Sequence, residues 1–537
     1  MNKSPTTEQK IIINENNNLV ITAKPGSGKT FTIIEKINKI SKDLMNFQGV
    51  IAISYTNKAS LELEQRYRRK NGEKNQHFFG TIDKFYILEI IIPFCHHLFE
   101  NGKNLRIIDN LSGNMKYKEL LELKSDNTNI NLILLLKEAL KEGNLFIELC
   151  GEIALLILRE VTQALIYLKA KYTHIFIDEY QDCGSIQHEI FLMLVKNSII
   201  GVAVGDLNQA IYGFAKRYPH FLISLIENKY FKHLELNTNH RCHSSISNYS
   251  LRLLGIIENH ELEENRMFKV NVAGHELHIV KAIEKNLDKI KNKYGIKNNS
   301  EIAILCRGTG TARRISQFLK LDNKLFIDTP LDKNNTEWGR LFNETIKGYF
   351  LYQVEEITLL DFVNKYLNEE LEAKKFKKSL ELINKLFSTS QLNLADNIFL
   401  FVEFAELIHP DLENIESINV LKKILKSDKS LGFFKPPLKN EINIMTLHKS
   451  KGLEFQCVFL FDVYKYIQPR EGNNVTKEDV LQALNLHYVG ISRAIEVCYI
   501  MIGTERYREK HDDYYKAVES PFLYKNNLHS FRRNVTW

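Results

Sequence analysis

Short apolar runs alternate with segments of helical periodicity along the chain. The runs that we expect to form buried strands are residues 18–21, 50–54, 175–177 and 199–204. After the first of these runs, isoleucines recur at helical spacing, at positions 33, 34, 37 and 40. Buried strands that alternate with amphipathic helices predict an α/β fold built on parallel sheets.

A glycine-rich loop, AKPGSGKT (residues 23–30), joins the first strand to the first helix. This is the context that the phosphate-binding pattern G-x-x-x-x-G-K-[ST] requires. Gly26 and Gly28 can adopt backbone angles that turn N–H groups toward an anion, and the new helix points its positive end at the same place. Lys29 would contact the β- and γ-phosphates of a nucleotide, and Thr30 would place its hydroxyl on Mg²⁺.

The loop departs from the strict pattern at its first position, where Ala23 replaces glycine. Lys24 and Pro25 fall in the variable stretch, where proline only stiffens the turn. A glycine-rich loop without a ligand is the alternative reading, but the strand, loop and helix around it favour a nucleotide site.

The segment HIFIDEYQD (174–182) places Asp178 and Glu179 directly after an apolar run. Ligands of open α/β sheets bind at the carboxyl ends of the strands. There, Asp178 would hold Mg²⁺ and Glu179 would orient and deprotonate an attacking water. An adjacent Asp-Glu pair is often only a solvated surface feature, but its position after a buried strand favours the catalytic reading.

The run 199–204 leads into GDLNQAIYGFAKR (205–217), in which Asp206 and Gln209 precede the aromatic residues Tyr212 and Phe214. These aromatic side chains either belong to the core or stack on nucleic-acid bases, which is worth about 1–3 kcal/mol per base. Two other segments, YTNKAS (55–60) and FFGTIDKF (78–85), carry hydroxyl and amide groups suited to phosphodiester contacts.

The composition is that of an ordinary globular protein with several domains. The chain has 537 residues, of which 44% are hydrophobic and 26% charged, and its net charge of +7 permits a nucleic-acid partner. Its seven cysteines are scattered singly, without a C-x-x-C pair, which argues against a zinc or iron–sulfur site. The sequence has no signal-peptide core and no long apolar stretch, so we expect a cytoplasmic protein.

The ordered motifs of the chain resemble those of superfamily 1 DNA helicases of the UvrD/Rep/PcrA family. In chain order they are TTEQKII (adenine-reading Q motif), AKPGSGKT (motif I, with alanine first), ISYTNKAS (Ia), FGTIDKF (Ib), IDEYQD (II), VGDLNQAIYGF (III), LNTNHRCHSSI (IV), IMTLHKSKGLEFQCVFL (V) and LHYVGISRA (VI). IAILCRG (302–308) resembles the strand that follows motif IV. One such motif is weak evidence, but the ordered series leaves little room for chance.

The resemblance implies a role for each matching residue. Expected catalytic residues are Lys29, Asp178, Glu179, Gln209, Arg241 and Arg493. Expected ATP-binding residues are Gln9, Ala23, Lys24, Pro25, Gly26, Ser27, Gly28, Lys29, Thr30, His240, Arg241, Glu454 and Arg493, with Thr30 and Asp178 at the metal. Expected DNA-binding residues are Tyr55, Thr56, Asn57, Thr81, Tyr212, Phe214, Thr446 and His448. The alternative for His448 is that it is an ordinary surface histidine and does not contact DNA.

Several positions depart from the family pattern. His240 stands where the family usually stacks adenine on tyrosine, so nucleotide affinity would be lower. Phe214 replaces a common tryptophan, Ala215 a usual arginine, and Asp83 a frequent histidine. The usual charged run before motif VI reads LQALN. None of these changes removes a residue required for hydrolysis.

The resemblance also implies a domain layout of two RecA-like P-loop NTPase domains with two mainly helical inserts. Residues 1–87 and 166–232 would form domain 1A, 88–165 the insert 1B, 233–325 and 438–510 domain 2A, 326–437 a reduced insert 2B, and 511–537 a C-terminal tail. The Lys/Glu-rich run in 2B is read as a solvated helix face.

The implied function is an ATP-dependent helicase or translocase that moves 3′→5′ on single-stranded DNA, with ATP and Mg²⁺ as cofactors. Its partners would be single-stranded DNA, tailed duplexes and a nuclease protein, because compact UvrD-like helicases of this kind resemble the helicase component of the Gabija antiphage system. A free-standing repair or plasmid helicase and an ATP-gated DNA-binding switch without unwinding are the alternatives. A helicase–nuclease fusion is disfavoured, since little sequence follows motif VI.

Overall fold

The computed structural model describes most of the chain. The described residues are 4–54, 57–71, 76–98, 103, 105–108, 116–117, 119–120, 130–207, 219–256, 264–334, 336–367, 372–410, 414–472, 475–508 and 511–537. Five predicted site residues, Tyr55, Thr56, Gln209, Tyr212 and Phe214, lie outside these ranges, as does the side chain of Asn57.

The first sheet contains all four strands expected from the apolar runs. Its order is β3-β2-β6-β7-β1-β8, and its neighbouring strands pair in parallel. The strands are β1 (Leu19–Ala23), β2 (Gly49–Ile53), β3 (Phe78–Gly80), β6 (Tyr172–Ile177), β7 (Ile200–Gly205) and β8 (Lys232–Leu236). The prediction of an α/β fold is therefore confirmed.

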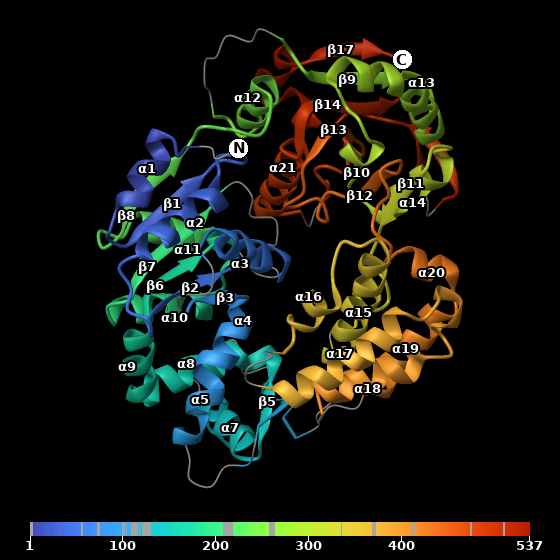
Figure 1. Ribbon diagram of the computed structural model, residues 1–537. Helices are drawn as coiled ribbons and strands as arrows, with labels where there is room; N and C mark the ends of the chain where they lie inside the picture. The colour runs from blue at the N-terminus through green and yellow to red at the C-terminus, as the bar shows by residue number, and fades with distance from the viewer. Residues whose placement is uncertain are drawn as a thin grey trace. The chain divides into compact units, whose positions relative to one another are not determined.

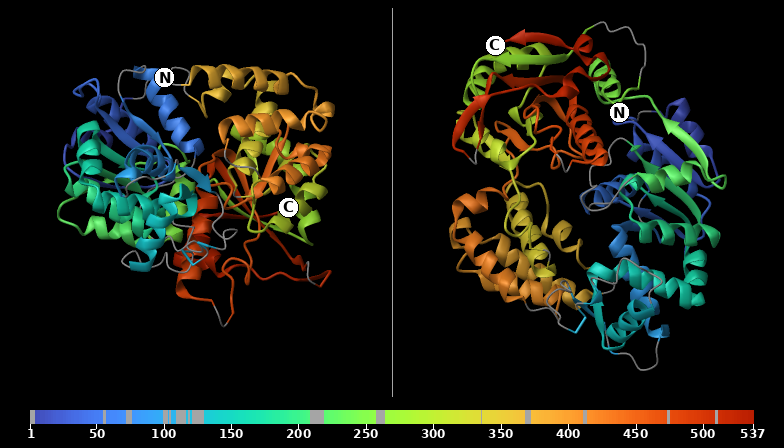
Figure 2. Two further views of the ribbon diagram at one scale, coloured as in Figure 1. Left: turned by 90° about the horizontal axis from the view of Figure 1, so that it is seen from below. Right: turned by 180° about the vertical axis from the view of Figure 1, so that it is seen from behind.

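Helices cover both faces of this sheet (Figures 1 and 2). They are α1 (Thr7–Asn14), α2 (Lys29–Ile40), α3 (Asn57–Asn71), α9 (Thr162–Lys171), α10 (Ser185–Lys196) and α11 (His220–Ile226). Ile33, Ile34 and Ile37 of α2 are buried against strand residues such as Ile21 and Val202, and Ile40 packs at the edge of this core. The helical spacing of these isoleucines thus reflects the face that α2 turns to the sheet.

The second sheet has the order β11-β12-β10-β13-β14-β9-β17. Its strands are β9 (Met267–Val272), β10 (Ile302–Cys306), β11 (Asn323–Phe326), β12 (Ile442–Thr446), β13 (Phe455–Leu460), β14 (Ala494–Gly503) and β17 (Arg533–Thr536). The helices α12 (Ser244–Leu253), α13 (Glu276–Tyr294), α14 (Thr309–Phe318) and α21 (Lys477–Ile491) accompany it, as does the hairpin β15–β16 (Glu505–Arg508 and Asp513–Lys516).

The end of the chain belongs to the second sheet. Residues 533–536, predicted to be part of a tail, form β17 and pair in parallel with β9 (Figures 1 and 2). The Trp537 ring then packs against Tyr499 of β14, with ring centroids 5.4 Å apart.

The chain divides into two compact units. Unit 1 comprises residues 1–94, 157–325 and 439–537 and holds both large sheets. Unit 2 comprises residues 95–156 and 326–438. In the second of these segments, a core around Trp338 and Phe342 joins the helices α15 (Glu337–Gln353), α16 (Leu359–Val363), α17 (Ala373–Phe387), α18 (Ile398–Ile408), α19 (Ile415–Leu425) and α20 (Asp428–Gly432).

The first segment of unit 2 lies in the predicted insert 88–165, which we expected to be mainly helical, and it contains two short strands besides its helices. Gly143, with φ of +87°, follows helix α7 (Ile130–Lys141), and the next residues form strand β5 (Asn144–Phe146), which pairs with β4 (Arg106–Ile108). Helix α8 (Cys150–Glu160) begins after this interruption. Within the described part of the chain, no helix is both long enough and apolar enough to cross a membrane.

Candidate functional site

The glycine-rich loop between β1 and α2 has the backbone conformation expected of a phosphate loop. Gly26 and Gly28 have φ values of +74° and +83°, in the left-handed region that favours glycine. A Cβ added to Gly26 would lie 2.6 Å from both Arg241 Cβ and Asn239 Oδ1. The loop therefore requires glycine both for its turn and for the close approach of the segment that carries Arg241.

Ser27, between the two glycines, is 1% exposed, and its Oγ has no hydrogen-bond partner among the described residues. A buried polar atom without a partner is costly unless a ligand satisfies it. With the first N–H groups of α2 at the same place, this arrangement fits a phosphate group.

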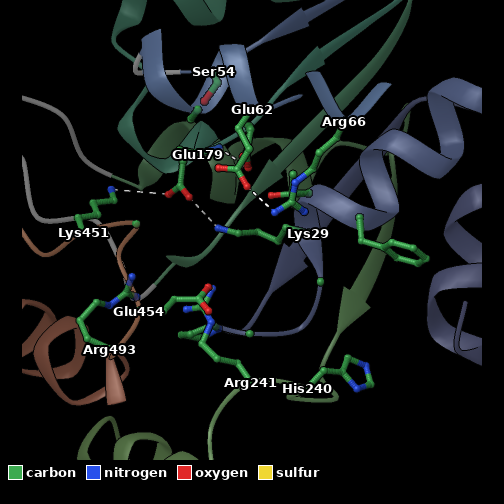
Figure 3. Close-up of a pocket in the computed structure, with 18 of the residues that line it drawn as sticks. Lys29, Ser54, Glu62, Arg66, Glu179, His240, Arg241, Lys451, Glu454 and Arg493 are labelled. Carbon is green, nitrogen blue, oxygen red and sulfur yellow. Dashed lines mark hydrogen bonds and ion pairs between the residues drawn. The ribbon is translucent and has the colours of Figure 1, made fainter. Parts of the chain in front are cut away.

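The loop opens onto a cavity of about 670 Å³. Figure 3 shows most of the side chains that line it. The lining residues include Pro25, Gly26, Gly28, Lys29, Thr30, Phe31, Ser54, Glu62, Arg66, Asp178, Glu179, Asp182, His240, Arg241, His448, Lys451, Glu454 and Arg493. Residues that follow strands of both large sheets thus meet at one cavity, whose volume is in the range of small-molecule sites.

Lys29 and Glu179 form an ion pair in this cavity, with 2.9 Å between Nζ and Oε1. Lys451 lies 3.6 Å from the other oxygen of Glu179, so two ammonium groups flank this carboxylate (Figure 3). Burial by itself raises the pKa of Glu179, but the charges of Lys29 and Lys451 outweigh it and hold that pKa well below its usual range. Glu179 has φ of +56°, a strained angle of the kind found at functional sites.

Asp178 is the second carboxylate, and its pKa is raised rather than lowered. Burial raises the pKa of Asp178 to about 6 against the lowering effect of Lys29, and the charge of Glu179 adds to the rise. Asp178 and Thr30 line the same cavity. A carboxylate and a hydroxyl at the phosphate loop are the ligands that Mg²⁺ uses in nucleotide sites, so these residues fit the ion.

Two arginines line the cavity: Arg241 follows β8 of the first sheet, and Arg493 directly precedes β14 of the second. Arg241 forms an ion pair with Glu454, with 2.5 Å between Nη2 and Oε1. Arg493 is 2% exposed, and its guanidinium donates to the carbonyl oxygens of Val489 and Leu453 at 3.0 and 3.2 Å. Burial and the neighbouring charge of Arg241 lower the pKa of Arg493 to about 10, so it remains positively charged at neutral pH.

His240 and Gln9, the expected adenine contacts, differ in their positions. His240 is exposed and lines the cavity, and its backbone N–H donates to the Gly26 carbonyl at 2.8 Å. Gln9 is 4% exposed, and both ends of its amide have protein partners. Its Nε2 donates to the Ser27 carbonyl at 3.2 Å and its Oε1 accepts from the Thr6 N–H at 3.0 Å. In this structure, Gln9 supports the phosphate loop.

Lys451, Asp182 and Gln181 contribute to the site but were not singled out from the sequence. Lys451 also pairs with Asp182, at 2.7 Å. Gln181 donates from its amide to Glu179 and accepts from the Asp206 N–H at 3.0 Å. Lys451 thereby connects the segment after β12 to the segment after β6. The quoted motifs IDEYQD and TLHKSKGLEF contain these residues, but only the fold shows that they meet.

The expected DNA-binding residues that the structure describes lie at different places. Thr446 ends β12 and is 8% exposed, and Thr81 precedes helix α4 (Ile82–Phe85) without capping it through its side chain. His448 lines the nucleotide cavity. Burial, with the charge of Arg307, lowers the pKa of His448 to about 4, so this ring is neutral at pH 7.

A second cavity, of about 340 Å³, lies at the carboxyl ends of β10 and β13 and was not predicted. It is lined by Arg307, Gly308, Thr311, Asp462, Tyr466, Ile467, Arg470 and Arg506. Asp462 accepts from Arg506 at 2.9 Å and from the Arg307 N–H at 2.8 Å. Among the described residues, no carboxylate forms an ion pair with the guanidinium of Arg307 or Arg470. The excess of positive charge makes this cavity suited to an anion.

The amino-acid sequence matches two family models that together span most of unit 1 and part of unit 2. The model described as the UvrD/REP helicase N-terminal domain matches residues 5–145 and 116–230, and the UvrD-like helicase C-terminal domain matches residues 353–504. The chain therefore belongs to the UvrD-like helicase family.

Individual relatives extend the match over almost the whole chain. The chain is 28% identical to the Gabija protein GajB of Bacillus cereus over 529 residues, which cover 97% of this chain and 99% of that protein. It is 23% identical to the probable DNA helicase II homolog of Mycoplasma genitalium, over 90% of this chain and 82% of that protein. It is 22% identical to the ATP-dependent DNA helicase PcrA of Staphylococcus aureus, over 94% and 84%.

Proposed function

We propose that this protein is an ATP-driven DNA helicase that translocates 3′→5′ on single-stranded DNA. The observation that carries the proposal is the cavity in which the phosphate loop, the Asp178–Glu179 pair, Arg241 and Arg493 meet. ATP bound there touches both sheets of unit 1, so its hydrolysis alters how the two sheets are held together.

Each group at the cavity has a distinct task in hydrolysis. The N–H groups of the loop and the Lys29 ammonium bind the β- and γ-phosphates. Mg²⁺, held by Thr30 and Asp178, neutralises phosphate charge when it is bound. Glu179 orients a water and accepts its proton, while Arg241 and Arg493 stabilise the charge that develops on the transferred phosphoryl group. Glu454 binds the ribose, and His240 stacks on the adenine.

In this structure Glu179 pairs with Lys29, with 2.9 Å between Oε1 and Nζ. Phosphate groups compete for Lys29 and so release Glu179 to act on water. The strongly lowered pKa of Glu179 means that the carboxylate is ionised whenever it is released. This exchange of partners supports a site that becomes active only when ATP occupies it.

The second cavity supports DNA binding. Three arginines with one carboxylate at the end of a parallel sheet provide guanidinium groups for backbone phosphates, and the 59% exposed Tyr466 offers a ring for base stacking. Thr81, Thr446 and His448 are proposed to contact the strand as well. The proposed stacking residues Tyr55, Tyr212 and Phe214, together with Thr56, Asn57 and the γ-phosphate sensor Gln209, fall outside the described side chains.

The domain assignment belongs to the same proposal. We assign residues 1–87 and 166–232 to RecA-like domain 1A, and 233–325 and 438–510 to domain 2A. Residues 88–165 and 326–437 are then the inserts 1B and 2B. The chain passes between the two compact units near residues 94, 156, 325 and 439. These positions support the assignment of two inserts.

We further propose that the helicase works beside a nuclease in antiviral defence. Its likeness to the Gabija protein GajB over almost the entire length of both chains supports this role. A free-standing repair or plasmid helicase is the second candidate, supported by the likeness to PcrA. Both candidates share the same ATP and DNA sites.

One set of assays tests the proposed activity. ATP hydrolysis by the full chain is titrated with single-stranded DNA, duplex DNA and RNA, and unwinding is followed on duplexes with a 3′ or a 5′ tail. We expect hydrolysis to be stimulated most by single-stranded DNA, and unwinding to require the 3′ tail. Hydrolysis without strand displacement would identify an ATP-gated switch instead, and a requirement for the 5′ tail would refute the polarity.

A further inference from the structure

The segment between β8 and α12 carries two groups of the nucleotide cavity, His240 and Arg241, although it belongs to neither a helix nor a strand. Its backbone is nevertheless held at almost every step. The His240 N–H donates to the Gly26 carbonyl at 2.8 Å. The N–H groups of Arg241 and Cys242 donate to Asn239 Oδ1 at 2.7 and 2.9 Å, which forms a turn around that side chain.

The first two N–H groups of this segment are held by Glu8. Its Oε2 accepts from the N–H of Asn237 at 3.0 Å and from that of Thr238 at 3.2 Å. Its Oε1 accepts from the Thr238 hydroxyl, also at 3.2 Å. One carboxylate therefore forms three hydrogen bonds to the start of the segment that ends in Arg241.

Glu8 lies on α1, next to Gln9, which donates to the phosphate loop at Ser27. The other end of α1 is fixed as well. The buried ammonium of Lys36 on α2 donates to the Ile12 carbonyl at 3.1 Å and to that of Glu15. These are C-terminal carbonyls of α1, which a cation satisfies favourably. One anchored helix thus contacts the phosphate loop and the arginine-bearing segment through adjacent residues.

We propose that Glu8 is a positioning residue for ATP hydrolysis, which holds the segment 237–242 against the phosphate loop so that Arg241 faces the γ-phosphate. The role rests on the proposed function of this cavity. Charge-assisted hydrogen bonds to backbone N–H groups suit the task, since they fix the course of the chain without involving the Arg241 side chain. Glu8 itself lies outside the cavity lining.

This role predicts a change in nucleotide discrimination. Arg241 acts on the γ-phosphate, which only the triphosphate carries, so a loosened segment costs a triphosphate more binding energy than a diphosphate. A role restricted to folding would lower the melting temperature but weaken both nucleotides equally. The ratio of the two affinities therefore separates positioning from stability.

The experiment measures binding of fluorescent AMPPNP and fluorescent ADP to the full chain, together with DNA-stimulated kcat and KM for ATP. Compared with the wild type, Glu8→Ala should shift the AMPPNP-to-ADP affinity ratio by about fivefold against AMPPNP and lower kcat by a similar factor. Glu8→Gln keeps an oxygen acceptor and should recover at least half of the loss. Lys10→Ala, at an exposed position of the same helix, is the matched control and should leave the ratio unchanged.

Three outcomes would count against parts of this account. An unchanged ratio in Glu8→Ala, with or without a lower melting temperature, would overturn the positioning role. No recovery in Glu8→Gln would also contradict it, because an acceptor oxygen is still present. A wild-type protein without DNA-stimulated hydrolysis would instead refute the proposed function, and this is measured first.

Discussion

The two adjacent carboxylates of the nucleotide cavity show how residues of similar chemistry acquire different tasks. Asp178 is buried and its pKa rises to about 6, whereas two lysines hold the pKa of Glu179 well below its usual range. Environments that push two pKa values apart are typical of sites in which each group has its own role. Glu179 is therefore ionised throughout the physiological pH range, whereas Asp178 takes up a proton as the pH falls through about 6.

Glu179→Gln should therefore lower DNA-stimulated kcat by at least about 100-fold, because the amide cannot accept a proton from water. Binding of ATP should remain, since Lys29 and the loop N–H groups are untouched. Lys29→Ala should abolish hydrolysis and weaken ATP binding as well. Steady-state hydrolysis and equilibrium binding of AMPPNP measure the two effects.

The matched control is Glu189→Gln on α10, whose carboxylate forms a surface ion pair with Arg159. It should keep wild-type turnover. Appreciable hydrolysis by the Glu179 variant would contradict the assignment of the base.

Helix α21 carries an unusual buried residue, His487. Its side chain is 0% exposed, and neither ring nitrogen has a hydrogen-bond partner among the described residues. Burial, with the charge of Arg532, lowers the pKa of His487 to about 3. Between this value and the ordinary value of 6.5, the unfolded chain binds a proton that the folded chain does not, so His487 destabilises the fold as the pH falls below about 6.5.

His487→Leu should therefore stabilise the protein, by about 1–3 kcal/mol at neutral pH, since it removes two buried nitrogens without partners. The gain should increase between pH 7.5 and pH 5. Melting temperatures of the wild type and the variant at the two pH values measure it, with the exposed His511→Leu as the control. A gain that does not increase in acid would show that His487 is not neutral in the fold.

The loop after β13 supplies the anion cavity of the second sheet. Asp462 and Tyr466 have φ values of +65° and +68°, and the strain of such angles is typical of functional segments. If this cavity holds backbone phosphate, Arg470→Ala should weaken binding of single-stranded DNA about three- to tenfold and reduce the slope of log affinity against log salt by about 1. Fluorescence anisotropy over a range of salt concentrations measures both values.

Lys465→Ala is the control in the same loop, because it removes a charge that is paired with Glu471 at 3.6 Å. Lys465 lies outside the cavity lining, so Lys465→Ala should change the salt slope less than Arg470→Ala does. Equal slopes for the two variants would mean that the loop acts only through its overall charge.

At the scale of helices and strands, the sequence predicted the secondary-structure elements better than the side-chain contacts between them. The strands of the first sheet and the phosphate loop follow from local patterns, because apolar runs and glycines act within a few residues. β5 was missed because it lies between two apolar helical segments and has no signal of its own. The ion pairs of Lys451 with Glu179 and Asp182, and the bonds of Glu8 to residues 237 and 238, join segments far apart in sequence, so only the fold could show them.

At the scale of the whole molecule, the two compact units differ in the sheets and cavities that they contain. Both nucleotide-facing sheets and both cavities belong to unit 1. Within its described part, the segment 327–438 of unit 2 contains helices and no strand, and it has its own aromatic core. Among the described residues, unit 2 contributes none to the lining of the nucleotide cavity, and we expect a partner that controls ATP hydrolysis to contact this unit.

We therefore expect the helicase to be isolated from its native host in a complex with a nuclease. Full-length protein, purified at native abundance through a tag and sized by mass photometry, should form a particle well above the 62.6 kDa of one chain. Mass spectrometry should identify a nuclease in that particle, and the complex should cleave DNA in a manner that depends on the helicase's ATP site. Glu179→Gln is the matched variant here, because it should keep the complex intact while it stops hydrolysis. A lone 62.6 kDa monomer with full unwinding activity would contradict the partner model and favour a free-standing helicase.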